Sequence, residues 1–265
     1  MNTSDSRKRS RRATTAVVAL VLVAALGLGA LSLFAGSDSG SGSRSGNGTG
    51  ADAGAGSGGR AKPPSAQERA LTALQRRAAG DPAALGEKDA PVVLIEYADF
   101  QCPFCGKFAR NTKPELIEKY VAEGVLRIEW RHFPVFGDES RAAARAGWAA
   151  GEQGRFWEFH DVAFGTERRK NSGEFADDRL VAMAEEAGVQ DLERFRRDMK
   201  SPAAKEAVAR DAAEGHHLGV TSTPAFLINS TPVLGAQPAE VFEDAIDRAR
   251  AAAGDSAGDG AGEKE

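Results

Sequence analysis

The hydrophobic pattern predicts a strand, a helix and a second strand in the middle of the chain. Residues 92–97 are largely apolar, which predicts a strand buried on both faces. Residues 102–123 then follow a helical spacing, with Pro114 expected to kink the helix and Gly124 to end it. Residues 126–131 alternate between apolar and polar side chains and predict a second strand. Strand, helix and strand at this spacing indicate a βαβ unit with parallel strands.

Helical spacing dominates on either side of this unit. Ser65 is a plausible N-cap for a helix that reaches Ala79, where a Gly-Asp-Pro sequence stops it. Residues 138–218 are helical throughout. They end in three short predicted helices, at Leu180–Ala187, Leu192–Met199 and Ala203–Leu218.

The last part of the chain returns to strands. Residues 225–228 predict a third strand, 229–232 a turn, and 233–234 a short partner strand. An amphipathic helix over 238–252 follows. Residues 253–265 are expected to form a disordered, solvated tail.

The N-terminal pattern is that of a membrane segment and a tether. Residues 1–12 carry a basic cluster, and 13–35 are uncharged and rich in Val, Leu and Ala, long enough to cross a bilayer as a helix. The basic cluster predicts a cytoplasmic N-terminus, with the rest of the chain outside. A cleaved signal peptide is the alternative, with a cleavage site near Ala30. Residues 36–63 are mostly Gly, Ser and Ala, which predicts a flexible linker.

Composition narrows the chemistry. The chain has 265 residues, 27% of them charged, and a net charge of −4, so no nucleic-acid partner is indicated. Its four histidines are not spaced at i, i+4 with one another or with a cysteine, so no metal site is expected.

Cys102 and Cys105 are the only cysteines, and their C-x-x-C spacing lies where the first strand meets the helix. Cys102 is then placed at the N-terminus of the helix, where unpaired N–H groups and the helix dipole favour a thiolate. The helix terminus alone lowers the pKa of Cys102 to about 7–8. A structural zinc site lacks two further ligands, and a structural disulfide in so small a ring stabilises little. The pair therefore indicates redox work.

Two stretches carry a resemblance to a known family. Residues 92–108 around the dithiol, together with the Thr223-Pro224 pair before the late strand, resemble the DsbA-like branch of the thioredoxin superfamily. The likeness covers roughly residues 80–252. It implies an α/β, thioredoxin-like fold over residues 64–252, with an inserted helical domain at about 138–218.

The resemblance also implies roles for residues. Cys102 is expected to be the nucleophile and Cys105 the buried resolving thiol. Glu96 occupies the position of the family's buried acidic residue and is expected to relay a proton; pointing to solvent, or pairing with Lys107, is the alternative. Asp99 is expected to be a surface residue or a turn former.

The remaining site residues face the substrate. The resemblance implies a cis bond before Pro224, which then lies against the dithiol and holds Thr223 in place to pair with an extended substrate. Pro103 and Phe104 separate the two cysteines. Because Phe104 stands where the best-known oxidants have a histidine, we expect a less stabilised thiolate and a less oxidising disulfide than in those members.

These features predict a membrane-anchored, extracytoplasmic thiol–disulfide oxidoreductase, single-pass and monomeric, that acts on exported cysteine-containing proteins in the oxidising direction. No cofactor is expected because the electrons travel through sulfur, but a membrane redox partner is needed to reset the dithiol. A reductase or isomerase using the same residues is the alternative, as is a non-catalytic binding or chaperone module of the same fold.

Overall fold

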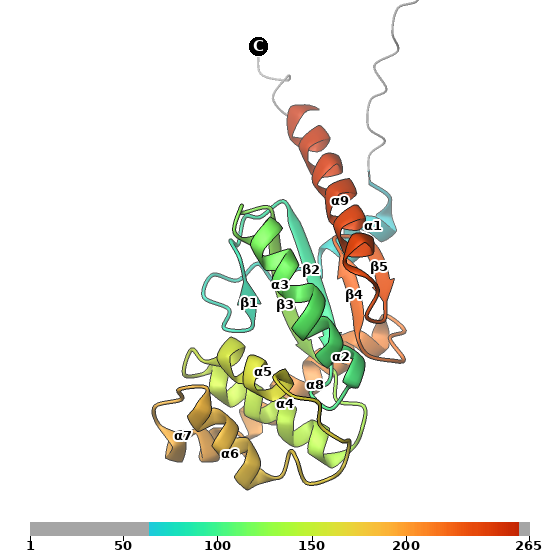
Figure 1. The fold of residues 1–265 in the computed structure, drawn as a ribbon. Coiled ribbons are helices and arrows are strands. Elements are labelled where there is room, and N and C mark those ends of the chain that lie inside the picture. Colours follow the sequence, from blue (N-terminus) through green and yellow to red (C-terminus); the bar gives the residue numbers. More distant parts are fainter. Residues whose placement is uncertain (1–63, 260–265) are drawn as a thin grey trace, which may run out of the picture. The chain divides into compact units, whose positions relative to one another are not determined.

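A five-stranded mixed sheet forms the centre of the computed structural model, which describes residues 64–259 and side chains as far as Gly254 (Figure 1). The strand order is β1-β3-β2-β4-β5. The strands are β1 (Ala84–Leu85), β2 (Val92–Ala98), β3 (Leu126–His132), β4 (Ala225–Ile228) and β5 (Thr231–Leu234). Both outer strands are short, and β5 contains Pro232.

The predicted βαβ unit is present. β2 and β3 are parallel, with Val92 opposite Leu126 and Ala98 opposite His132. β4 pairs antiparallel with β2 on its other side, and all seven residues of β2 are buried, as its apolar run predicted.

The helical segment after β2 is not a single regular helix. It consists of α2 (Pro103–Lys107), a π-helical turn η1 (Phe108–Thr112), α3 (Lys113–Leu116) and a second π-helical turn η2 (Ile117–Val121). Pro114 lies in the first turn of α3, directly after η1. A proline lacks an N–H and its ring crowds the carbonyl four residues earlier, so the widened π turn accommodates it where a kink was expected. Gly124 has a φ of 71° and follows the end of the helix, as predicted.

Nine α-helices are described in residues 64–259. Apart from α2 and α3 they are α1 (Ala66–Thr72), α4 (Asp138–Gly151), α5 (Phe156–Phe164), α6 (Asp177–Glu186), α7 (Leu192–Asp198), α8 (Pro202–His217) and α9 (Ala239–Asp259). Helices α4 to α8 occupy the stretch predicted to be a helical insertion.

The helices cover both faces of the sheet. Phe108, Leu116 and Phe242, from the segment after the dithiol and from α9, pack on the face that carries Leu94 and Ile128. The opposite face carries Val93, Ile95 and Tyr97 and is covered by residues of α1 and α8. The sheet therefore lies between two helical layers, with α4 to α7 packed together beside it (Figure 1).

Two helix ends differ from the sequence prediction. Ser65 caps α1 in a capping box with Glu68, but the helix ends at Thr72 rather than Ala79. The backbone N–H groups of Arg76 and Arg77 donate to the Glu129 carboxylate, so this segment leaves the helix to bind β3. Helix α9 runs to Asp259, past the expected end at Ala252 and into residues expected to form a disordered tail.

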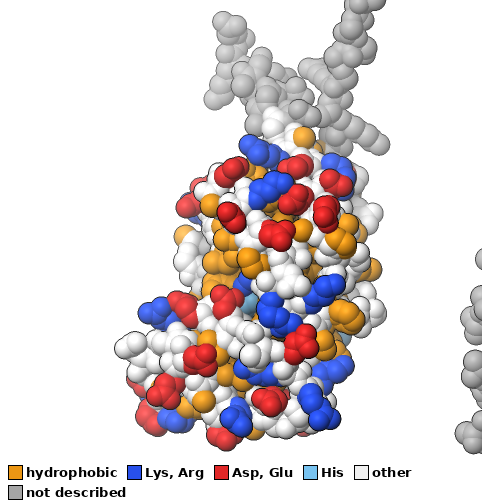
Figure 2. Space-filling view, in the orientation of Figure 1, with side chains coloured by type: hydrophobic (Ala, Val, Ile, Leu, Met, Phe, Trp, Pro, Cys, Tyr) orange, Lys and Arg blue, Asp and Glu red, His pale blue; other side chains and the backbone are white. Residues whose placement is uncertain are grey.

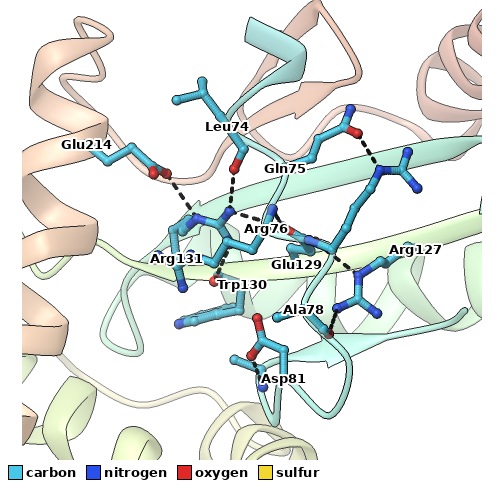
Figure 3. Close-up of polar contacts among 12 residues, drawn as sticks. Leu74, Gln75, Arg76, Ala78, Asp81, Arg127, Glu129, Trp130, Arg131 and Glu214 are labelled. Atoms are coloured by element: carbon cyan, nitrogen blue, oxygen red, sulfur yellow. Dashed lines mark hydrogen bonds and ion pairs between the residues drawn. The ribbon is translucent and has the colours of Figure 1, made fainter. Parts of the chain in front are cut away.

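Strand β3 is buried along its whole length despite alternating polar residues. Alternation is typical of a strand with one face in water. Here Arg127 and Arg131 flank Glu129 and pair with its two oxygens at 3.0 Å each. Arg131 also donates to the Leu74 carbonyl and pairs with Glu214 of α8 at 2.9 Å (Figure 3). The polar face of β3 thus binds the segment after α1 instead of water.

The predicted segments 1–12, 13–35 and 36–63 lie outside the described residues. Among the helices of residues 64–259, none has the length and apolar character needed to cross a membrane.

Candidate active site

Cys102 lies at the junction that the sequence predicted. β2 ends at Ala98, a short turn follows, and Cys102 is the N-cap of α2 with Pro103 in the first turn. The turn depends on Asp99, which is buried rather than on the surface: its carboxylate accepts hydrogen bonds from the N–H groups of Gln101 (2.8 Å) and Val135 (2.6 Å). Asp99 therefore holds the loop of the dithiol to the loop after β3.

The structure holds both cysteines as free thiols. The Cys105 backbone N–H donates to Cys102 Sγ at 3.4 Å, and the Cys102 thiol donates to the Thr223 carbonyl oxygen at 3.2 Å. A hydrogen bond from the Cys105 side chain is the largest influence on the pKa of Cys102. Burial opposes it, but the nearby Thr223 side chain and the N–H groups of Cys105 and Phe104 also lower the pKa, which falls to about 6.

That pKa lies below the value of about 7–8 expected from the helix terminus alone. The difference comes from the Cys105 thiol, which stabilises the Cys102 thiolate directly. With a pKa of about 6, about nine-tenths of Cys102 is thiolate at neutral pH.

Cys105 has the opposite character. It is fully buried one turn into α2, and burial is the main reason that its pKa is raised well above that of a free thiol. Its hydrogen bond to Cys102 and the negative charges of Cys102 and Glu96 raise the pKa further. Cys105 can therefore act as a nucleophile only when a neighbouring group accepts its proton.

Glu96 is fully buried on β2, and neither carboxylate oxygen has a hydrogen-bond partner among the described residues. Neither alternative from the sequence, exposure or a pair with Lys107, is found. Burial raises the pKa of Glu96 to about 8, against the attraction of Lys113, while the Cys102 thiolate adds to the rise. A carboxyl group with this pKa can exchange protons at neutral pH.

Sequence reasoning missed Lys113, whose positive charge acts to lower the pKa of Glu96. Lys113 is buried in α3, and its Nζ lies 2.8 Å from Asp161 Oδ1 and 3.0 Å from His160 Nδ1, both in α5. No sequence motif marks this lysine, because only the packing of α5 encloses it. Burial is the main cause that lowers the pKa of His160 to about 3, so this histidine is a neutral ligand of the ammonium group.

A hollow of about 530 Å³ opens beside this lysine, between the segment after the dithiol and α5. Figure 2 shows hydrophobic side chains gathered between these elements. Its apolar lining includes Leu85, Ile117, Trp157 and Phe164.

The bond between Thr223 and Pro224 is cis, as the resemblance implied. The loop that carries it precedes β4, and its Thr223 carbonyl contacts Cys102 directly. The Thr223 hydroxyl is buried and has no hydrogen-bond partner among the described residues.

The other predicted site residues lie at the surface. Phe104 is 61% exposed and Pro103 is exposed beside it, although Cys102 itself is only 3% exposed. Cys102 and Pro103 line a hollow of about 280 Å³ together with Phe100, Arg110 and Phe164. A substrate sulfur can approach Cys102 from this hollow.

The family of this chain is found by comparison. A family model described as Thioredoxin matches residues 78–248. The protein named "Probable disulfide bond formation protein D" from Bacillus cereus is 31% identical over 148 residues, which cover 55% of this chain and 68% of that protein. A Na(+)/H(+) antiporter NhaA 1 from Salinispora arenicola is 32% identical over 163 residues, 61% of this chain. The match spans only 24% of the antiporter.

A solved structure shares the fold. The crystal structure of a thioredoxin-like oxidoreductase from Silicibacter pomeroyi is 30% identical to this chain, with a TM-score of 0.55. The match covers 65% of this chain and 98% of that one.

Proposed function

The chain belongs to the thioredoxin family, in its DsbA-like branch of thiol–disulfide oxidoreductases, and we propose that it oxidises cysteine pairs in exported proteins. The observation that carries the direction is the contrast between the two thiols. A Cys102 thiolate that is stabilised in the reduced enzyme makes the Cys102–Cys105 disulfide easier to reduce, and hence a stronger oxidant.

The reaction needs two exchanges. A substrate thiolate attacks the Cys102 sulfur of the enzyme disulfide, a mixed disulfide forms, and Cys105 leaves as a thiolate. A second substrate thiolate then attacks the substrate sulfur of the mixed disulfide, and Cys102 leaves as a thiolate. The substrate gains a disulfide and loses two electrons, which the enzyme now holds as two reduced sulfurs.

Glu96 supports the Cys105 half of this cycle. When Cys105 leaves, protonated Glu96 gives it a proton; when Cys105 attacks a mixed disulfide, Glu96 takes the proton back. The supporting observation is a buried carboxyl group without a hydrogen bond whose pKa is raised to about 8 mainly by burial.

The substrate is expected to lie extended along the loop of Thr223 and Pro224, with its cysteine at Cys102 and with Pro103 and Phe104 beside it. The exposed Phe104 ring offers an apolar contact for an unfolded chain. This arrangement suits unfolded, exported proteins, with the catalytic domain outside the cell membrane and residues 13–35 as its anchor. A quinone-linked membrane redox partner then takes the two electrons.

The redox potential of the Cys102–Cys105 pair against glutathione tests the direction. We expect a potential well above that of thioredoxin, which is about −270 mV. A potential at or below that value overturns the oxidising direction and supports the reductase alternative.

Trapping variants test the chemistry itself. Cys105→Ala in the full chain is expected to accumulate mixed disulfides with substrate proteins, because the resolving thiol is absent. Cys102→Ser is expected to trap none and to lose exchange activity. Unchanged function in Cys102→Ser would instead identify a non-catalytic binding module.

A further inference from the structure

A basic strap borders the hollow of Cys102. We define it as residues 166–171, between α5 and α6, which include Arg168, Arg169 and Lys170. Together with Arg110 of the helix after the dithiol, Arg168 and Arg169 line the hollow, against a single lining acid, Glu167. This local excess of positive charge stands on a chain whose net charge is −4.

The strap is fixed at both ends. Near its start, Arg168 donates to the carbonyl of Val162 at the end of α5. At its end, the Asn171 N–H donates to Gln101 Oε1 at 2.7 Å, and Gln101 directly precedes Cys102. The strap is therefore held beside the dithiol by the residue next to the nucleophile.

Most charges of the strap already have partners. Arg168 caps α5, Lys170 lies 4.1 Å from the centre of the Phe136 ring, and Glu167 is 3.4 Å from Arg110. Arg169 differs: it is exposed and lines the hollow, and its side chain forms no hydrogen bond or ion pair with the described part of the chain. Its guanidinium group is free to bind an incoming chain.

From this arrangement we propose that the enzyme selects substrate segments that carry a carboxylate close to the reactive cysteine, with Arg169 as the residue that binds it. The inference rests on the proposed function and names the substrate class for that same site. A guanidinium group at the mouth of a partly apolar hollow matches a carboxylate in shape and charge. Fixed positive charge also speeds the encounter with an acidic chain.

The test uses the full chain in its disulfide form and reduced peptides with two cysteines that differ only in one flanking residue, Glu, Gln or Lys. An acidic neighbour also changes the reactivity of the peptide thiol, so the informative quantity is a ratio. The kcat/KM for the Glu peptide divided by that for the Gln peptide is measured for the wild type and for Arg169→Gln. The wild-type ratio is then divided by the ratio of the variant.

We expect Arg169→Gln to lose about two- to fivefold of the preference for the Glu peptide, the size of an exposed ion pair. Arg169→Glu should shift the preference toward the Lys peptide, and salt near 1 M should remove the difference by screening. Arg179→Gln is the matched control, an exposed arginine on α6 outside the lining of the hollow, and should keep the wild-type ratio.

Equal ratios in the wild type and Arg169→Gln would overturn the proposed selection while leaving the oxidoreductase function intact. If the wild type oxidises none of the three peptides, the proposed direction fails as well. The two failures are therefore distinguishable in one set of assays.

Discussion

At the scale of single residues, Cys105 has two effects that can be separated by substitution. Cys105→Ala removes the hydrogen bond that most lowers the pKa of Cys102. A hydrogen bond to a charged group contributes about 1.5–3 kcal/mol. The titration midpoint of the Cys102 thiol should therefore rise by about one to two pH units. Cys105→Ser keeps a donor and should move the midpoint less. Thiolate absorbance at 240 nm against pH measures this, and equal midpoints in both variants would contradict it.

Glu96→Gln should slow catalysis and stabilise the folded protein at high pH. The folded-state pKa of Glu96, about 8, lies above its value of about 4.3 in an unfolded chain. The folded state therefore holds the proton more tightly, and the stability from this group is present below about pH 4.3 and lost as the pH rises through 8. The variant should lack this loss and unfold at a higher temperature at pH 9, while resolving mixed disulfides more slowly. Thermal unfolding at pH 5 and pH 9 checks the first effect, and an unchanged difference between wild type and variant would contradict it.

Lys113→Met tests the same carboxyl group by removing the positive charge that acts on it. Because the positive charge of Lys113 lowers the pKa of Glu96, its removal should raise that pKa above about 8. The pH profile of mixed-disulfide resolution should then move to higher pH. Lys107→Met, an exposed lysine of α2, is the control and should leave the profile in place. A profile that does not move in Lys113→Met would show that the lysine serves packing alone.

The site residues that the sequence revealed are those in short motifs. Cys102, Cys105 and Pro224 could be located because each lies in a pattern whose geometry is local or shared by a family. Lys113, Asp161 and Arg169 could not be located, because their roles depend on how α5 and the strap pack against the helix of the dithiol, about fifty residues away in sequence.

At the scale of elements, β3 depends on a buried charge network rather than on apolar burial alone. Burial acts to raise the pKa of Glu129, but hydrogen bonds from the backbone of Arg76 and Arg77 and from Arg127 outweigh it, and the pKa is lowered. Glu129→Gln leaves two buried arginines with one fewer charged partner and should destabilise the protein by about 3–5 kcal/mol. Chemical denaturation measures this, with Glu115→Gln, an exposed change in α3, as the control.

The same network predicts a dependence on acid. Because the pKa of Glu129 is lower in the folded chain than in the unfolded one, its stabilisation is present above about pH 4.3 and is lost as the pH falls further. Glu129→Gln should flatten this acid loss. The same slope in wild type and variant would contradict the assignment.

The hydrophobic pattern of the sequence predicts where strands lie better than it predicts which segments pack against them. The existence, order and parallel pairing of β2 and β3 could be predicted from periodicity, but the burial of the polar face of β3 could not. That face is covered by the segment from Leu74 to Ala78, which itself read as part of a helix. Local propensity gave way there to tertiary hydrogen bonds with a buried strand.

At the scale of the whole molecule, the dithiol lies where two parts of the fold share one core. Cys102 and Cys105 pack with Phe100 and Trp130 of the thioredoxin half and with Phe159 of the helical insertion. The Phe100 and Trp130 rings stack at 5.1 Å between centroids. The insertion is therefore part of the wall around the sulfurs, and the folded unit is expected to act as one body.

The anchor is a prediction at this same scale. Residues 13–35 should keep the full chain with membranes, so sedimentation after alkaline carbonate washing should leave it in the pellet. A chain lacking residues 1–35 should move to the supernatant. After a membrane-impermeant reductant has opened the Cys102–Cys105 disulfide, a membrane-impermeant maleimide added outside intact cells should label Cys102. Release of the full chain by carbonate, or protection of Cys102 from the reagent, would contradict the predicted topology.

The two edge strands of the sheet determine how readily other extended chains can pair with the protein. If its substrates are unfolded chains, as proposed, many of their segments could pair with an open β-edge. The edge strand β1 has only two residues. The other edge strand, β5, contains Pro232, which has no N–H to donate. Extended chains that exchange disulfides with Cys102 should therefore be released without pairing with the sheet edge and aggregating with the protein.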